Sequence, residues 1–361
     1  MLSQKTKQST ITPPKRRLLE IDFMRFSAAI AVVLYHYTSQ KLVVDSVRVP
    51  VFPMLEPITR YGYLGVDLFF MISGFVILLS SINRTPFEFV VSRVSRLYPG
   101  YWAAIFFTVA VVAIFDQSGK EVPLFDFLMN LTMVNDYFDI KDIDGVYWTL
   151  HVELKFYFLI FSLIIFRQIK HVEKWLFFWV SIVIVHSLSG FPTFLGWFIN
   201  PSYSSYFIAG ATFYLILTKG ISNGRLLLIA ASYILSLANA LMQIEGFIHD
   251  DVLWFDQVVT VIAITCFFIL FGAISLGKTS FLRKKYFIPL GALTYPLYLI
   301  HNVAGKAFFN TIILYTNKYS ALLFTLFFAV GGAWIIYYVI ERKASVFIKN
   351  KMLQARIFLT S

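Results

Sequence analysis

Apolar stretches of membrane-spanning length recur along this sequence of 361 residues, and short polar segments separate them. A transmembrane helix needs about 20 predominantly apolar residues, with a range of about 17 to 25. Because 58% of the residues are hydrophobic and only 14% are charged, the composition excludes an ordinary soluble domain. The stretches of sufficient length lie at residues 20–38, 61–82, 98–117, 147–167, 174–190, 203–218, 225–243, 254–275, 289–313 and 320–341. We therefore predict an all-α polytopic membrane protein with about ten transmembrane helices.

The distribution of basic residues predicts how these helices are oriented. If the N-terminus is cytoplasmic, 22 of the 31 lysines and arginines fall into cytoplasmic segments, whereas the longest outer loop, around 118–146, carries five aspartates. This alternation follows the positive-inside rule, so we expect both termini in the cytoplasm and a multi-pass protein in the inner membrane of the cell. The rule also accounts for the net charge of +11. Since the basic residues form short clusters and no continuous basic face, we expect membrane lipids and no nucleic acid as partners.

One membrane domain occupies almost the whole chain. Residues 1–17 form a basic cytoplasmic tail without an apolar core, and we expect the first apolar run to act as an uncleaved signal anchor. The membrane domain is expected at residues 18–343, and a second short basic cytoplasmic tail at 344–361.

The apolar run Leu18–Thr38 carries two functional candidates, Arg25 and His36. At about 100° and ~1.5 Å per residue, the eleven steps between them place both side chains on nearly one stripe, roughly 16 Å apart. Ionisable groups inside a membrane are costly and mark functional sites more often than not. One face of this helix is thus expected to hold a cation near the cytoplasmic surface and a titratable base deeper inside.

Two acidic residues are expected at a depth similar to that of His36. Asp67 follows Gly65 in the stretch GYLGVDLFFMISGF, and it is either the partner of a histidine or a carboxylate bathed in water at the end of a loop. Glu153 lies about two turns into its helix, in WTLHVELKFY, where an unpaired glutamate is difficult to explain as packing.

A second histidine, His301, is predicted near mid-membrane in the stretch LTYPLYLIHN. Tyr295 and Tyr298 lie on adjoining turns, and Pro296 is expected to kink this helix. The histidine is either a functional group or a satisfied packing group.

Arg93 and Arg96 precede Pro99 in the stretch RVSRLYPGY. Because proline suits the first turn of a helix, we place the arginines at a helix N-terminus, where guanidinium groups and the helix dipole together bind anions. With Arg25 nearby, the three residues form a candidate site for a phosphorylated cofactor. Alternatively, they are charges that only set the topology. His36, Asp67, Glu153 and His301 have no metal-ligand spacing that we recognise, and we expect no metal.

Together these motifs resemble the membrane acyltransferase 3 family, over essentially the whole chain and in the expected order. Arg25 and His36 look like the R-x10-H motif of the family, and GVDLFFMISGF looks like its G-V-D-x-F-F-x-x-S-G-F motif. The remaining motifs are similar to RVSRLYPGY, WTLHVELKFY and YPLYLIH of this chain.

The resemblance implies an O-acyltransferase of the stand-alone type, which transfers an acyl group, usually acetyl from acetyl-CoA, to a hydroxyl of a carbohydrate or lipid-linked saccharide. Arg25, Arg93 and Arg96 are then expected to bind the acyl-CoA. His36 acts as a general base or as a covalent carrier, with Asp67, Glu153 and His301 as further catalytic candidates. The alternative is a proton-coupled secondary transporter, in which the same four residues form a proton relay.

Overall fold

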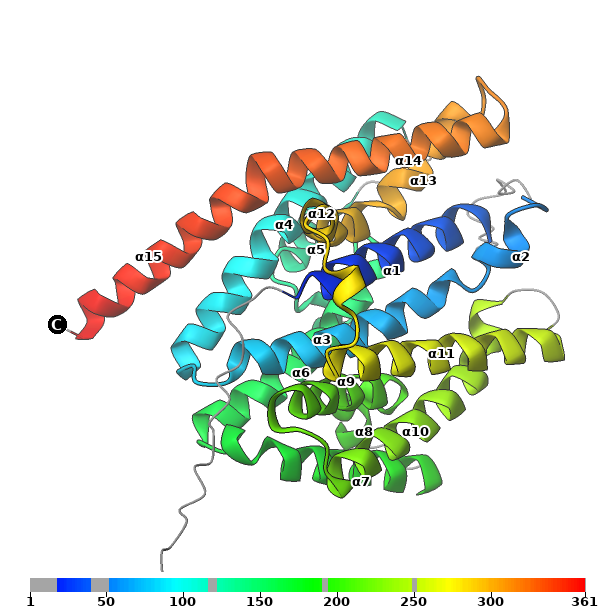
Figure 1. Ribbon diagram of the computed structural model, residues 1–361. Coiled ribbons are helices and arrows are strands. Elements are labelled where there is room, and N and C mark those ends of the chain that lie inside the picture. Colours follow the sequence, from blue (N-terminus) through cyan, green and yellow to red (C-terminus); the bar gives the residue numbers. More distant parts are fainter. Residues whose placement is uncertain (1–17, 40–51, 116–121, 190–193, 249–251, 361) are drawn as a thin grey trace, which may run out of the picture.

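The computed structural model describes residues 18–39, 52–115, 122–189, 194–248 and 252–360, and every regular element within these ranges is a helix. Figure 1 shows the long helices packed side by side in one bundle. Seven helical segments in the described part of the chain are long and apolar enough to cross a membrane: Glu56–Ser81, Pro86–Phe115, Gly145–Ile165, Ile169–Ser189, Asn223–Phe247, Trp254–Ser275 and Lys318–Arg356. The all-helical membrane architecture is thus confirmed, and the number of ten spans stays a prediction.

Each of the ten predicted ranges coincides with at least one long helix. These helices are α1 (Leu19–Thr38), α3 (Gly65–Ser81), α4 (Pro86–Phe115), α6 (Trp148–Ile165), α7 (Val172–Ser189), α9 (Pro201–Lys219), α10 (Asn223–Phe247), α11 (Trp254–Ser275), α12 (Phe287–Ile300), α13 (Val303–Ile312) and α14 (Lys318–Ile335). A π-helical segment, Ile336–Glu341, joins α14 to α15 (Arg342–Thr360). Short helices α2 (Glu56–Thr59), α5 (Leu124–Asn130) and α8 (Phe194–Ile199) lie in the connections.

The helix expected to begin near Pro99 begins thirteen residues earlier, at Pro86, so the placement of the arginines at a helix N-terminus was wrong. A capping box marks the true start, because the Thr85 amide donates to Glu88 Oε2 (2.9 Å) and the Glu88 amide donates to Thr85 Oγ1 (3.3 Å). Pro86 occupies the position that proline favours. Pro99 lies inside the helix. Arg93 and Arg96 therefore lie about two turns into α4.

The predicted kink at Pro296 is also displaced. α12 continues through the proline to Ile300, and the chain breaks at His301 and Asn302 before α13 begins. The break releases backbone groups inside the bundle, and membrane proteins tolerate this only where neighbouring groups bond to them.

The structure describes only the second of the two predicted tails. Residues 1–17 lie outside the described residues. Residues 344–360 are helical and belong to α15, which packs against α4. In Figure 1, α14 and α15 form one long rod that extends past the edge of the bundle.

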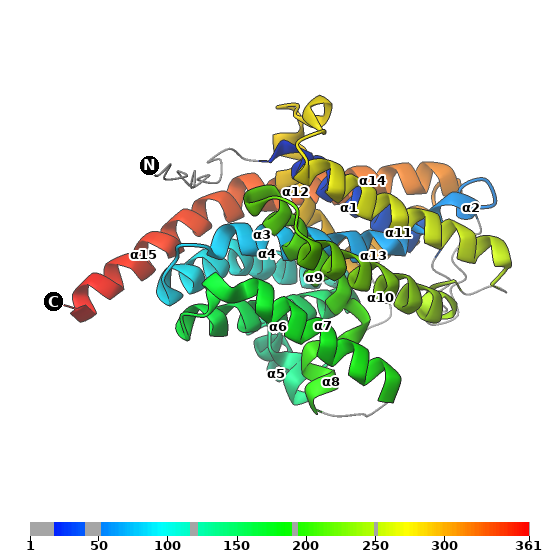
Figure 2. The ribbon, with the colours of Figure 1, turned by 60° about the horizontal axis from the view of Figure 1, so that its bottom comes forward.

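α3 lies at the centre of the bundle, packed against α9 on one side and α1 on the other. Glycines permit both close contacts. Gly74 and Gly210 face backbone atoms across the α3–α9 contact, and Gly62 and Gly65 face the backbone of α1. On the far side of α1, α12 packs against α1, α4 and α14, while Figure 2 shows α7, α8 and α10 on the opposite side of α9. The backbones of the central helices are therefore in direct contact at these glycines.

We expect Gly210→Ala to destabilise the bundle, because its new Cβ would lie 2.9 Å from the backbone nitrogen of Phe75. Forcing such overlap costs about 1–3 kcal/mol. The matched control is Gly331→Ala in α14, where a Cβ meets nothing within 4 Å and the better helix propensity of alanine is gained. The thermal melting temperature of the purified protein in detergent measures both. Equal melting temperatures of the two variants would contradict the close packing of α9 against α3 at Gly210.

Candidate active site

A cavity of about 500 Å³ lies inside the bundle between α1, α3, α4, α6, α12 and the π segment with α15. Arginines line one end, including Arg25, Arg93 and Arg96. Apolar side chains of α3 line the middle, and Thr149 and Tyr298 line the other end. Four of the seven residues expected from the sequence, namely Arg25, Arg93, Arg96 and Glu153, therefore face one space.

Two arginines at the basic end are fixed by neighbours of different kinds. Arg93 donates from Nη2 to the hydroxyls of Ser80 (3.1 Å) and Ser92 (3.0 Å), and its guanidinium faces the adjoining rings of Phe89 and Tyr157. Its buried Nε finds no hydrogen-bond partner among the described residues. This nitrogen is therefore a donor that the protein leaves unused.

Arg96 forms an ion pair with Glu341, with 3.0 Å between Nη1 and Oε1. Glu341 is the last residue of the π segment and is buried. π segments recur at functional positions because they redirect side chains within a helix. Here the segment directs a carboxylate into the basic end of the cavity.

Glu153 lies deeper in the cavity than this ion pair and accepts a hydrogen bond from the Ser73 hydroxyl of α3. Its negative charge acts on Arg25, as does that of Asp22 on the same helix as the arginine. Glu153 is thus bound to a serine and balances a cation, and the structure does not bring it to a histidine.

The two histidines expected from the sequence meet at the other end of the bundle. The rings of His36 and His301 stand edge to face, with centroids 4.9 Å apart. Since α1 and α12 also meet where Asp22 contacts Gly291, the two helices run parallel and contact each other at both levels. Helix packing therefore places the imidazoles together.

The hydrogen bonds of His301 define its tautomer. Nδ1 lies 2.7 Å from the carbonyl oxygen of Tyr298, which only accepts, so the proton is on Nδ1. In the neutral ring Nε2 then carries a lone pair, and this nitrogen has no hydrogen-bond partner in the described part of the chain. The Tyr37 hydroxyl donates to the carbonyl of His301 (2.7 Å) and fixes its backbone. His301 is thus held with a buried ring nitrogen that carries a lone pair.

Tyr298 connects the cavity with the histidine pair. It lines the end of the cavity opposite the arginines, and its ring centroid lies 5.5 Å from that of His301. Its hydroxyl lies 3.1 Å from the hydroxyl of Thr149, and Phe69 packs against its ring on the cavity side. The cavity and the histidines are therefore separated by the thickness of one aromatic side chain.

Asp144, which the sequence did not single out as a site residue, secures the break after His301. Its carboxylate accepts from Asn302 Nδ2 (2.8 Å), from the amide of Val303 (2.8 Å) and from the amide of Val146 (3.2 Å). Burial raises the pKa of this carboxyl, and the three donors oppose that shift. One carboxylate thus caps the segment before α6 and the start of α13.

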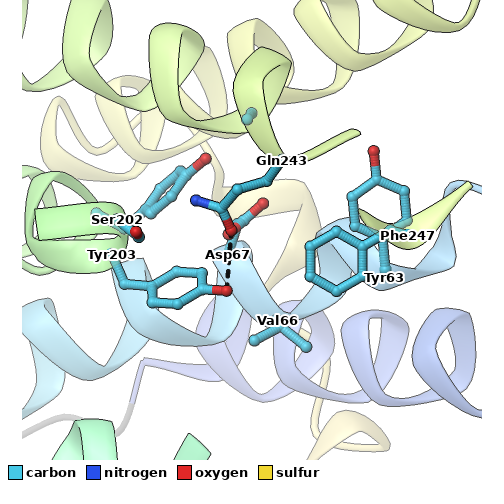
Figure 3. A pocket seen from close by; sticks show the side chains of 9 residues that line it. Tyr63, Val66, Asp67, Ser202, Tyr203, Gln243 and Phe247 are labelled. Carbon is cyan, nitrogen blue, oxygen red and sulfur yellow. Dashed lines mark hydrogen bonds between the residues drawn. The ribbon is translucent and has the colours of Figure 1, made fainter. Parts of the chain in front are cut away.

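Asp67 lies apart from the other candidates. It is 8% exposed and lines a small pocket between α3, α9 and α10, with Tyr206 close by. Figure 3 shows Tyr203 and Gln243 beside Asp67. The Tyr203 hydroxyl donates a hydrogen bond to Gln243 Oε1 (3.1 Å). The described residues that line this pocket include no histidine. Burial argues against a water-bathed carboxylate, and the expected partnership with a histidine is not seen.

Comparisons with known proteins identify a family and several relatives of this chain. The sequence model of a family described as an acyltransferase domain matches residues 18–338. The O-acetyltransferase OatA of Staphylococcus aureus is 30% identical over 172 residues, which are 42% of this chain and 25% of OatA. The exopolysaccharide production protein ExoZ of Rhizobium meliloti is 49% identical over 45 residues, which are 12% of this chain and 14% of ExoZ. This chain thus matches a quarter or less of the length of each of these relatives. No solved structure matches the chain.

We expect Asp144→Asn to destabilise the protein, because an amide oxygen replaces the two carboxylate oxygens and an NH2 group meets donors at that position. Leaving a buried donor without a partner costs about 1–3 kcal/mol. Asp139→Asn is the matched control, since Asp139 is exposed in the same loop and asparagine tolerates its left-handed backbone (φ 57°). Melting temperatures in detergent compare the two variants, and a larger loss for Asp139→Asn would refute the role of Asp144.

Proposed function

The chain belongs to the acyltransferase 3 family, and we propose that it transfers an acetyl group from acetyl-CoA to a hydroxyl of a cell-surface or exported carbohydrate. One observation carries the proposal. A single cavity has an arginine-rich end suited to phosphates, and its other end adjoins a pair of histidines suited to proton transfer. A donor with phosphates at one end and a thioester at the other matches both ends.

The donor enters from the cytoplasm, where acyl-CoA is available. With ten spans and both termini inside, the arginine-rich end of the cavity faces this compartment. Arg25, Arg93 and Arg96 bind the phosphates through charge-assisted hydrogen bonds, and the unused Nε of Arg93 supplies one donor. The arm that bears the thioester lies along the apolar face of α3, and its acyl end reaches Tyr298.

The histidine pair acts on the acceptor hydroxyl. Nε2 of one imidazole removes the hydroxyl proton while the oxygen forms a bond to the thioester carbonyl carbon, and the carbon–sulfur bond then breaks. The thiolate of CoA leaves and takes up a proton, so the histidine returns to its neutral form. General base catalysis of this kind contributes roughly 10²- to 10⁴-fold to the rate. The second imidazole, packed edge-on, shares the charge of the first.

The two carboxylates have other roles in this proposal. Glu153, bound to Ser73, balances the charge of Arg25 and keeps the inner part of the cavity polar enough for the donor arm. Asp67 ties α3 to α9 and α10 at the contact on which the position of α3 depends.

The acceptor is a carbohydrate or a lipid-linked saccharide that approaches the histidines from the outer side of the inner membrane. The name of OatA, an O-acetyltransferase, and that of ExoZ, an exopolysaccharide production protein, support this class of acceptor. No metal and no nucleic acid takes part in the proposed reaction.

We expect His36→Gln and His301→Gln each to lower the rate of CoA release by about 10²-fold or more, with the affinity for acetyl-CoA unchanged. Arg93→Gln combined with Arg96→Gln is expected to lower that affinity first. His171→Gln is the matched control, because this histidine is exposed in the turn between α6 and α7.

The assay supplies purified protein with acetyl-CoA and a glycan extract of the host, and measures free thiol and bound acetyl-CoA. Loss of donor binding in the histidine variants would contradict the division between the two ends. If the wild type neither binds acetyl-CoA nor releases CoA, the acyl transfer proposal fails and proton-coupled transport takes its place.

A further inference from the structure

The basic end of the cavity extends beyond the part of the chain that matches the family. The family match ends at residue 338, whereas α15 begins at Arg342. Four residues of α15 nevertheless line the cavity: Arg342, Ser345, Val346 and Lys349. α15 is thus a wall of the proposed donor site and not a free tail.

The spacing of these four residues shows that one face of α15 is turned to the cavity. They stand at positions i, i+3, i+4 and i+7, which lie on a single stripe of an α-helix. Arg342 and Lys349 occupy the two ends of the stripe, with the serine and the valine between them. The stripe therefore presents two cations, about two turns apart, to the same space as Arg93 and Arg96.

The position of α15 relative to the membrane follows from length. The continuous helical segment Lys318–Arg356 contains 39 residues. At ~1.5 Å per residue it measures about 58 Å, roughly twice the thickness of the hydrocarbon core. Its later part therefore leaves the membrane on the arginine side. There it packs along α4, and the guanidinium of Arg356 lies 5.2 Å from the ring of Phe87.

The charges that face the cavity do not balance. Five cationic side chains line it, and the carboxylates among its described lining residues are Glu153 and Glu341. Charges of one sign that gather in the wall of a cavity repel each other and attract counter-ions. Glu341 pairs with Arg96, and among the described lining residues no ion pair joins Arg342 or Lys349 to a carboxylate. A ligand that carries several negative charges is what this wall fits.

We propose that α15 completes the donor site and that Arg342 and Lys349 bind phosphate groups of the nucleotide portion of acyl-CoA. This inference rests on the proposed function, and it adds a subsite in a segment outside the family match. In this arrangement Arg93 and Arg96 hold the phosphates from α4, and Arg342 and Lys349 hold them from the neighbouring α15. Anionic lipid headgroups share the same phosphate chemistry, and the experiment below separates the two sources.

The test measures binding of radiolabelled acetyl-CoA to the full-length protein, purified in nanodiscs of neutral phosphatidylcholine. Arg342→Gln combined with Lys349→Gln is expected to weaken binding roughly tenfold to hundredfold, as the loss of charge-assisted hydrogen bonds predicts. The control removes two charges from the same helix outside the cavity, with Lys343→Gln and Lys351→Gln, and is expected to change affinity less than threefold.

Competition by S-acetylpantetheine, which has the thioester arm but no nucleotide phosphates, separates binding from structure. Its affinity is expected to be the same in the wild type and in the α15 variant. An equal loss for both ligands would show that α15 only holds the fold together, and it would overturn the proposal. So would unchanged acetyl-CoA affinity in the α15 variant.

A second set of nanodiscs contains phosphatidylglycerol. If the α15 variant binds acetyl-CoA normally in neutral discs and differs from the wild type only in the anionic ones, Arg342 and Lys349 serve lipid headgroups and the proposal is overturned. If the wild type binds S-acetylpantetheine and acetyl-CoA equally, the phosphate subsite fails while acyl transfer stands. If the wild type binds neither, the donor and the proposed function fail together.

Discussion

The cost of placing charges inside a membrane bundle governs this structure. A buried charge needs an opposite charge or several hydrogen bonds, because the low-dielectric interior offers it no other stabilisation. Most ionised groups in the described bundle meet this requirement. Glu20 accepts from Arg283 (2.6 Å) and Thr279 (3.1 Å), and Tyr61 donates to Asp256 (2.6 Å). The cavity departs from this pattern, since its cations outnumber its carboxylates. Two of these cations, Arg342 and Lys349, are exposed, so solvent stabilises part of the excess positive charge of the cavity.

The same constraint explains why the chain breaks where it does. Interrupting α12 and α13 at His301 frees backbone groups within the bundle, and each of them costs several kcal/mol if left without a partner. Tyr37 bonds to the carbonyl of His301, and Asp144 bonds to the amide of Val303. His301 itself keeps helical backbone angles at the end of α12, and its imidazole meets that of His36 there. Side chains from distant segments thus stabilise the irregular backbone at this break.

The sequence predicted the helices, and which charged residues lie in the bundle interior, better than it predicted helix faces and interaction partners. Charged residues in apolar helices are costly to expose to lipid, so they face the interior of the bundle. This explains why one cavity contains Arg25, Arg93, Arg96 and Glu153. Asp67 was harder to place. It lies two residues after Gly65, which is about 200° around α3, so it faces α9 and α10 while the glycine faces α1. Only the positions of the neighbouring helices decide which of these faces meets a histidine.

Long-range partners left no local signal in the sequence. Arg96 and Glu341 are 245 residues apart, and Asn302 and Asp144 are 158 apart, so no spacing rule connects them. The start of α4 was different, because the segment Thr85–Glu88 carries a complete capping box and a proline in first position. That boundary was readable from four residues. The prediction failed because Pro99, which the helix tolerates in its interior, received more weight.

The parallel arrangement of α1 and α12 separates the proposed donor site from the histidine pair. Arg25 and Gly291 lie at the cavity level of these helices, and His36 and His301 lie at the other. A helix fixes the rise between two of its residues, so the eleven residues from Arg25 to His36 set a separation of roughly 16 Å that no loop movement alters. In the proposed reaction the donor bridges this distance to place its acyl group beside an imidazole. That reaction therefore requires a long arm between the phosphates and the thioester, and a compact acyl phosphate held at the arginines would not reach the histidines.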